Sequence, residues 1–182
     1  MDTMGLRQRV LVSGSDDYNT QMLYFTCSSL SADDRYIYLL SDRTGSPNVV
    51  VKDLKTGEER VLTDNRKGIM KSYVYFDGTE GEGLSKASVC QDPKRNVVYY
   101  IQDNEIFKVG LDGQVRRLNR IPDGRMTAFT HVSADGRFLC VPMTDGRCLE
   151  YDPGASGPAF CDYHEANPPL PRGPSGGLGG GL

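Results

Sequence analysis

A repeated alternation of turns and apolar runs constrains this chain more than any other feature. The stretch Leu30–Thr63 holds three short runs rich in Val, Ile and Tyr, at residues 36–40, 48–54 and 60–63. Clusters of Asp, Gly, Pro and Ser separate these runs, which is typical of tight turns between β-strands. Together with the apolar run Met22–Cys27 just before it, the stretch predicts a four-stranded antiparallel meander.

The same pattern recurs twice further along the chain. Residues 85–118 give four strand-like runs, and residues 126–151 give three, with a turn Ser133–Arg137 that nearly repeats Ser31–Arg35. The second copy starts about 60 residues after the first, and its excess over the roughly 40 to 45 residues of such a unit lies in residues 67–84. A sheet of this kind has two apolar faces, so it requires neighbours of its own kind.

The first unit resembles the repeat of the TolB-like, WD40-like β-propellers. Ala32 and Asp34 stand where that repeat has Pro and Gly, and both are tolerated in a turn. The resemblance implies an all-β fold: a β-propeller fragment of about three four-stranded antiparallel blades, incomplete relative to a seven-bladed parent. The matching positions are Ser31–Asp34, Tyr36–Tyr38, Ser41–Arg43, Gly45, Val51–Leu54, Gly57–Glu58 and Leu62–Thr63.

The pattern divides the chain into five segments. The C-terminal one begins at Pro153, after which 14 of 30 residues are Gly or Pro, and we expect it to be disordered. We interpret this ending as a truncation, an altered reading frame or an added tail; the alternative is a natural functional tail. The segments are residues 1–20, a closing outer strand (Gln8–Val12) and loop; 21–66, blade 1; 67–120, blade 2 with its insertion; 121–152, blade 3, incomplete because it lacks a fourth strand; and 153–182, the tail.

Three blades do not close a ring, since propellers typically have four to eight. An open array leaves blade faces and strand edges exposed, which favours association. We therefore expect the chain to be the N-terminal part of a larger propeller. The alternative is self-association with another copy through the open blade edges.

Composition and charge limit the classes of molecule that this chain is expected to bind. The net charge of −3 and the pI near 5.4 argue against nucleic acid, whose phosphates require clustered cations. No apolar run approaches the roughly 20 residues of a membrane span, and the N-terminus lacks the apolar core of a signal peptide, so we expect a cytoplasmic location.

The five cysteines show no CxxC spacing, and Cys27, Cys90 and Cys140 fall in apolar runs, as buried free thiols do. With two histidines in all, we assign this chain no metal site and no cofactor.

Ligands of propellers usually meet the end that carries the loops into the inner strands and the hairpins between second and third strands. Arg43, Lys71, Lys86 and Arg125 are predicted there as substrate-binding cations for an anion such as a uronate carboxylate. His131 is predicted near the axial end of an inner strand, as a substrate contact or general base. The competing interpretations are solvated surface cations and a hydrogen-bonded structural histidine.

Residues 7–152 are also similar to the N-terminal part of the oligogalacturonate lyases, a seven-bladed propeller family. The similarity rests on a polar loop before an aromatic run (Tyr18–Cys27), on Gly45–Asn48 and on Ile106–Val109. It implies a parent that cleaves acidic, pectin-derived oligogalacturonides by β-elimination, with a histidine base, an arginine and a bound Mn²⁺. The family places those residues in later blades, so we transfer no catalytic residue and expect this chain alone to be inactive. The alternative is a non-catalytic, TolB-like binding module that works through protein contacts.

Overall fold

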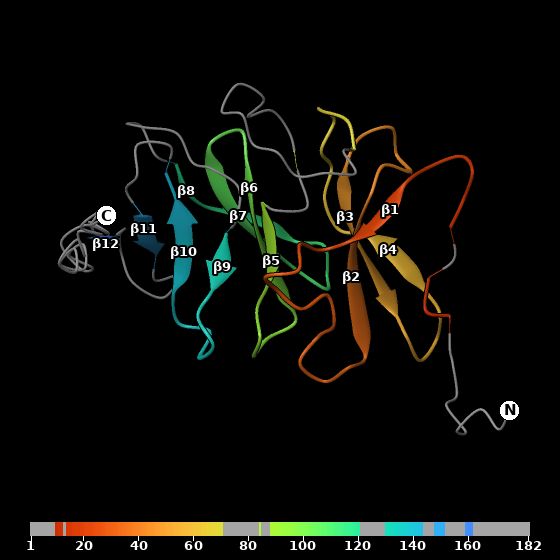
Figure 1. Cartoon of the computed structure of the whole chain (residues 1–182), viewed down its shortest axis with the longest axis horizontal. Helices are drawn as coiled ribbons and strands as arrows, with labels where there is room; N and C mark the ends of the chain where they lie inside the picture. The colour runs from red at the N-terminus through yellow and green to blue at the C-terminus, as the bar shows by residue number, and fades with distance from the viewer. Residues whose placement is uncertain are drawn as a thin grey trace, which may run out of the picture.

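The computed structural model describes residues 10–12, 14–70, 84, 88–120 and 130–143, and the backbone of 148–151 and 159–161. These residues form three four-stranded antiparallel meanders, blades 1 to 3, which stand side by side in chain order (Figure 1). The predicted all-β fold is confirmed. Blade 1 contains β1 (Thr20–Met22), β2 (Tyr36–Ser41), β3 (Asn48–Asp53) and β4 (Glu59–Val61); blade 2 contains β5 (Val89–Gln91), β6 (Val97–Gln102), β7 (Glu105–Gly110) and β8 (Val115–Arg120); blade 3 contains β9 (His131–Val132), β10 (Leu139–Pro142), β11 (Cys148–Tyr151) and β12 (Ala159–Cys161).

The sequence analysis was wrong about the fourth strand of blade 3. We expected the blade to end at residue 152, but β12 pairs with β11 in antiparallel register, with Cys161 opposite Cys148. The free backbone edge of β11 supplies hydrogen-bonding partners that do not depend on side chains, so a strand forms within a Gly/Pro-rich stretch. The remaining segment boundaries stay predictions.

Two predicted strands near the N-terminus also differ from the structure. Gln8 and Arg9 lie outside the described residues, and Val10–Val12 are not in a strand. Leu11 and Val12 instead pack as apolar side chains on the outer side of blade 1. The predicted strand 22–27 is wrong as well, because β1 ends at Met22.

The chain leaves the sheet after β1 and rejoins it a few residues later. The hydroxyl of Ser29 accepts the N–H of Leu23 at 2.9 Å, and the carbonyl of Ser29 accepts the N–H of Tyr38 at 2.7 Å. Residues 23–28 are thereby expelled as a loop, which passes in front of β5 in Figure 1. At its end, the thiol of Cys27 donates to the carbonyl of Val89, 3.7 Å away in blade 2. This hydrogen bond therefore links the loop that follows β1 to β5, the inner strand of blade 2.

Alternation of side chains along the strands gives each blade two apolar faces. In blade 1, Tyr36, Tyr38 and Leu40 pack toward blade 2, whereas Ile37 and Leu39 face the other way. We call the side toward the preceding blade the near face and the side toward the following blade the far face.

The core consists of apolar layers between successive blades. The far face of blade 1 packs on the near face of blade 2, which contributes Val98 and Tyr100. The far face of blade 2 packs on the near face of blade 3, which contributes Leu139 and Val141. The residues in these layers are almost completely buried, so blade-to-blade contact holds the array together.

The turn between the first and second strands has the same hydrogen bonds in blades 1 and 3. The hydroxyl of Ser31 donates to Asp33 Oδ1 at 2.6 Å, and that of Ser133 donates to Asp135 Oδ1 at 2.6 Å. This bond lowers the pKa of each aspartate. Asp34, at the position where the repeat usually has Gly, takes a left-handed backbone with φ of 54°, which Asp tolerates better than most residues.

Blade 2 has Asp92 in the place of Ser31. Its carboxylate is fully buried and accepts the N–H groups of Lys94 and Arg95 at 2.8 and 3.1 Å. The guanidinium of Arg95 lies 3.2 Å from the same carboxylate and donates to the carbonyl of Gly136 at 3.1 Å. This turn therefore attaches blade 2 to blade 3.

Within the described ranges, the structure contains no apolar helix of membrane-spanning length.

Replacement of Gly136 by Ala should destabilise the protein more than replacement of Gly57 by Ala. Both glycines have positive φ, 72° and 81°, so each alanine costs about 1 kcal/mol of backbone strain. A Cβ at 136 would also lie 3.1 Å from Asp92 Oδ1, whereas nothing lies within 4 Å of one at 57. We expect Gly136→Ala to lose about 1 kcal/mol more in urea unfolding. Equal losses would show that the turn does not press against blade 2.

Candidate functional site

The end of the array that carries the loop into β1 and the hairpins β2–β3 and β6–β7 is the predicted ligand-binding end, which we call the hairpin end. Asp42 closes the first loop against the first hairpin. Its carboxylate accepts the backbone N–H and the side-chain amide of Asn19, at 2.6 and 3.0 Å. The residue pair Thr20 and Ser41, where β1 meets β2, brings two hydroxyls to within 3.0 Å of each other. Asp42 therefore positions the loop that leads into the inner strand.

A buried amide network supports the same hairpin. Asn48 Oδ1 accepts the hydroxyl of Thr63 at 2.7 Å and the N–H of Asn65 at 2.6 Å, and Asn48 Nδ2 donates to the carbonyl of Asn65 at 2.9 Å. The amide of Asn65 donates in turn to the carbonyl of Pro47 at 2.8 Å. In blade 1, the hydroxyl of Thr63 therefore holds the asparagine that begins β3.

The network continues into the next blade. Gln102 Nε2 donates to Asn65 Oδ1 at 3.3 Å, and the ammonium of Lys67 lies 3.5 Å from the carboxylate of Asp103. Asp103 and Asn104 form the β6–β7 turn, both with positive φ (50° and 63°), as the tight Asx-rich hairpin predicted from the sequence requires. The two hairpins are thus held in a fixed relation across the first blade interface.

Arg43 lies in the β2–β3 hairpin, but its guanidinium lies over the near face of blade 1. It donates to Glu59 Oε2 at 2.6 Å and to the hydroxyl of Ser41 at 3.2 Å, and it lies 4.9 Å from the centre of the Tyr18 ring. The ammonium of Lys52 reaches Glu59 Oε1 at 3.0 Å. Burial raises the pKa of Glu59, but the hydrogen bonds from Arg43 and Lys52 outweigh it and hold the pKa below its ordinary value. Arg43 is therefore neutralised within its own blade.

The structure does not test the predicted anion-binding set as a whole. Lys71, Lys86 and Arg125 lie outside the described residues. His131 is exposed and pairs with Cys140, whereas its neighbour Val132 packs toward blade 2. Alternation therefore places His131 on the far face of blade 3, at the opposite end of the array from Arg43.

The described residues do not form a metal site. Nowhere in this part of the chain do three His, Cys, Asp or Glu side chains converge as ligands of an ion. Cys27 and Cys90 are free thiols, and burial raises the pKa of both. Cys90 is fully buried as predicted, while Cys27 and Cys140 are half-buried.

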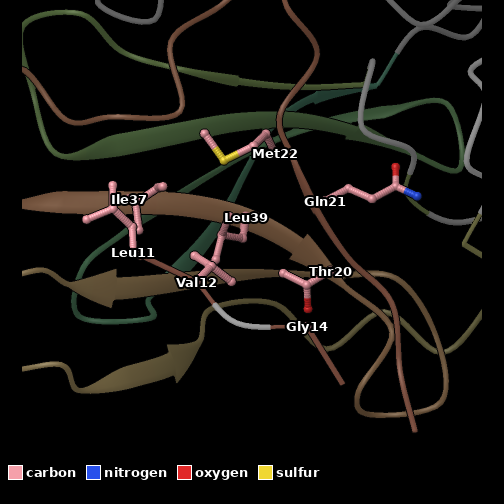
Figure 2. Close-up of a pocket in the computed structure, with 8 residues that line it drawn as sticks. All are labelled: Leu11, Val12, Gly14, Thr20, Gln21, Met22, Ile37 and Leu39. Carbon is pink, nitrogen blue, oxygen red and sulfur yellow. The ribbon is translucent and has the colours of Figure 1, made fainter. Parts of the chain in front are cut away.

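A cleft of about 360 Å³ opens on the near face of blade 1, away from the predicted site. In Figure 2, Leu11, Val12, Ile37 and Leu39 lie together, while the side chain of Gln21 points away from them. Sequence analysis missed this cleft, although Ile37 and Leu39 alternate with the residues that face blade 2 and so already mark a second apolar face. The lining residues are Leu11, Val12, Gly14, Thr20, Gln21, Met22, Ile37 and Leu39.

Solved structures with the same arrangement of sheets are propellers. An oligogalacturonate lyase in complex with manganese is 14% identical, with a TM-score of 0.60 over 79% of this chain and 41% of its own. An oligogalacturonate lyase from Vibrio parahaemolyticus is 12% identical, with a TM-score of 0.61 over 81% of this chain and 42% of its own. TolB from Acinetobacter baumannii is 17% identical, with a TM-score of 0.51 over 87% of this chain and 35% of its own.

The chain folds as three blades of a β-propeller. It spans less than half the length of each of these three propellers. No family model matches the chain, and no curated protein matches it. At these identities the likeness establishes the propeller fold, in agreement with the TolB-like and lyase-like resemblance of the sequence.

Replacement of Asn48 by Ala should lower the free energy of unfolding by about 3 kcal/mol, because the N–H and the carbonyl of Asn65 would lose their buried partner. Asn96→Ala, at a half-buried position in the β5–β6 turn, is the matched control and should change stability by less than about 0.5 kcal/mol. Urea unfolding of both variants provides the comparison. Equal effects would refute a supporting role for the network.

Replacement of Glu59 by Gln should reduce stability at pH 7 and have less effect in acid. The folded-state pKa of Glu59 is lowered, so its charge stabilises the fold above the ordinary carboxyl pKa of about 4.3. That contribution is lost as the pH falls through the lower, folded-state value. Unfolding of the wild type and Glu59→Gln at a series of pH values should show the two curves converging in acid. Glu58→Gln, at a side chain 68% exposed, is the control and should show little difference at any pH.

Proposed function

We propose that this chain supplies the scaffold blades of a carbohydrate-active propeller of the oligogalacturonate-lyase type, and that it has no β-elimination activity by itself. The carrying observation is the likeness to two oligogalacturonate lyases, with TM-scores of 0.60 and 0.61 against 0.51 for TolB. The proposed ligand of the complete ring is an acidic oligosaccharide. The role proposed for these blades is to form one wall of its cleft.

The geometry of the hairpin end supports a wall in preference to a reaction centre. Its loops are fixed by hydrogen bonds to Asp42 and Asn48, so they present a preorganised polar surface. Of the cations near it that the structure describes, Arg43 pairs with Glu59 and Lys67 with Asp103. A uronate carboxylate would have to displace one of these carboxylates, so the described residues favour hydroxyl contacts over charge capture.

The second candidate is a TolB-like module that binds other proteins. The observation in its favour is the apolar cleft on the near face of blade 1, with Met22 half-exposed beside it. This candidate requires no sugar contact at the hairpin end, so the two functions are separable by experiment.

Incubation of the purified chain with trigalacturonate, with and without Mn²⁺, should give no conjugated unsaturated product by ultraviolet absorbance. Amide NMR spectra should nevertheless show weak, saturable shifts at the hairpin end, near Asn19, Asp42 and Gln102, because that surface is the proposed wall. Maltotriose, whose glucose units orient the C4 hydroxyl differently, is the control and should bind more weakly. Product formation would refute the scaffold role, and the absence of any shift with trigalacturonate would favour the protein-binding module.

A further inference from the structure

The outer strand of blade 2 is an open edge with an excess of positive charge. β8 reads Val-Arg-Arg-Leu-Asn-Arg, and among the described strands only β7 pairs with it. Its three arginines are exposed. Blade 2 has a neighbour on each face, because blades 1 and 3 both pack on it. The open edge therefore belongs to the outer side of the array and does not result from a missing blade.

Backbone pairing at this edge places two cations opposite each other. Lys108 in β7 is the register partner of Arg116 in β8. Within the described ranges, neither side chain forms an ion pair with a carboxylate. Like charges directly opposite on neighbouring strands are destabilising, so the fold of the blade does not explain this pair. In blade 1 the matching strands pair opposite charges, with the ammonium of Lys52 3.0 Å from Glu59 Oε1.

The other two arginines of β8 share a single carboxylate. Arg117 Nη1 lies 3.1 Å from Glu105 Oε1, and Arg120 Nε lies 3.9 Å from the same oxygen. Strands β7 and β8 together contain four cations and one carboxylate, a net charge of +3, whereas the whole chain has a net charge of −3. Positive charge is thus concentrated on an edge whose backbone is open to another strand.

We propose that an acidic, extended segment of another protein adds to β8 as a fifth strand of blade 2. Backbone hydrogen bonds join it to the open edge, as in other cases of strand addition. Alternation places Arg116 on one face and Arg117 on the other, so carboxylates on both faces of the added strand meet a guanidinium. Val115, which is 47% exposed, adds an apolar contact.

The charge selects the partner. Arginines on an edge strand ordinarily prevent its pairing with a basic strand or with a second copy of itself. Against an acidic strand the same charges are attractive, and they raise the rate of association. The proposal rests on β7 and β8 alone, so it does not depend on the proposed carbohydrate function at the hairpin end.

The test is binding of a fluorescein-labelled peptide of alternating Val and Glu to the purified chain, followed by fluorescence anisotropy at low salt. The peptide should bind saturably, and a peptide of alternating Val and Lys should not. The Val-Glu peptide with every second amide N-methylated keeps its charge but loses backbone donors, so it should bind at least about tenfold more weakly. Failure of the Val-Glu peptide to bind would overturn the proposal. So would equal binding of the N-methylated peptide or of an oligodeoxythymidine, because either would show attraction to any polyanion.

Two charge reversals locate the site. Arg116→Glu should weaken binding of the Val-Glu peptide at least about tenfold. It should also raise the midpoint of urea unfolding, because Lys108 then has an opposite charge across from it. Arg60→Glu, at a side chain 46% exposed on the outer strand of blade 1, is the matched control and should bind as the wild type does. Equal losses in the two variants, or a lower midpoint for Arg116→Glu, would overturn the assignment to β8.

Discussion

Contact between apolar sheet faces is the interaction on which this structure depends. A four-stranded meander whose second strand reads Tyr-Ile-Tyr-Leu-Leu is apolar on both sides, and no strand of the same meander can cover both. Both apolar faces of blade 2 are covered, because it packs between blades 1 and 3. Blade 1 packs on another blade on one side only, and on its other side Leu11 and Val12 cover Ile37 and Leu39. Met22 and His131 lie on faces that contact no other described blade, and both are exposed.

Much of the recognisable repeat motif serves this stacking and the turns that permit it. The Ser-x-Asp turn sets the register of the second strand, and its counterpart Asp92 extends the role by joining blades 2 and 3 through Arg95. The threonine of the Leu-Thr pair fixes Asn48 and, through Asn65, the hairpin of the next blade. A chain can therefore keep the motif while its ligand changes, and motif likeness identifies a fold before it identifies a reaction.

Local pattern was enough to predict β2 to β4 of blade 1, β6 to β8 of blade 2 and the Asx hairpin, because turns and alternation are encoded over a few residues. The errors fall where distant contacts decide. The break after Met22 depends on Ser29 accepting the N–H of Leu23, and β12 depends on the edge of β11. For the site, sequence correctly identified Arg43 as part of the β2–β3 hairpin. It did not show that Glu59, in another strand, holds the guanidinium on a different surface.

The loop after β1 carries a thiol, that of Cys27, whose reactivity reports on the contact between blades 1 and 2. Cys27 packs against both interblade layers, and its thiol, whose pKa burial raises, donates to the carbonyl of Val89. Alkylating reagents attack the thiolate, so this sulfur should react slowly while blades 1 and 2 stay in contact. The rate at which Cys27 is labelled would follow the separation of blades 1 and 2. It would therefore measure this local opening separately from global unfolding.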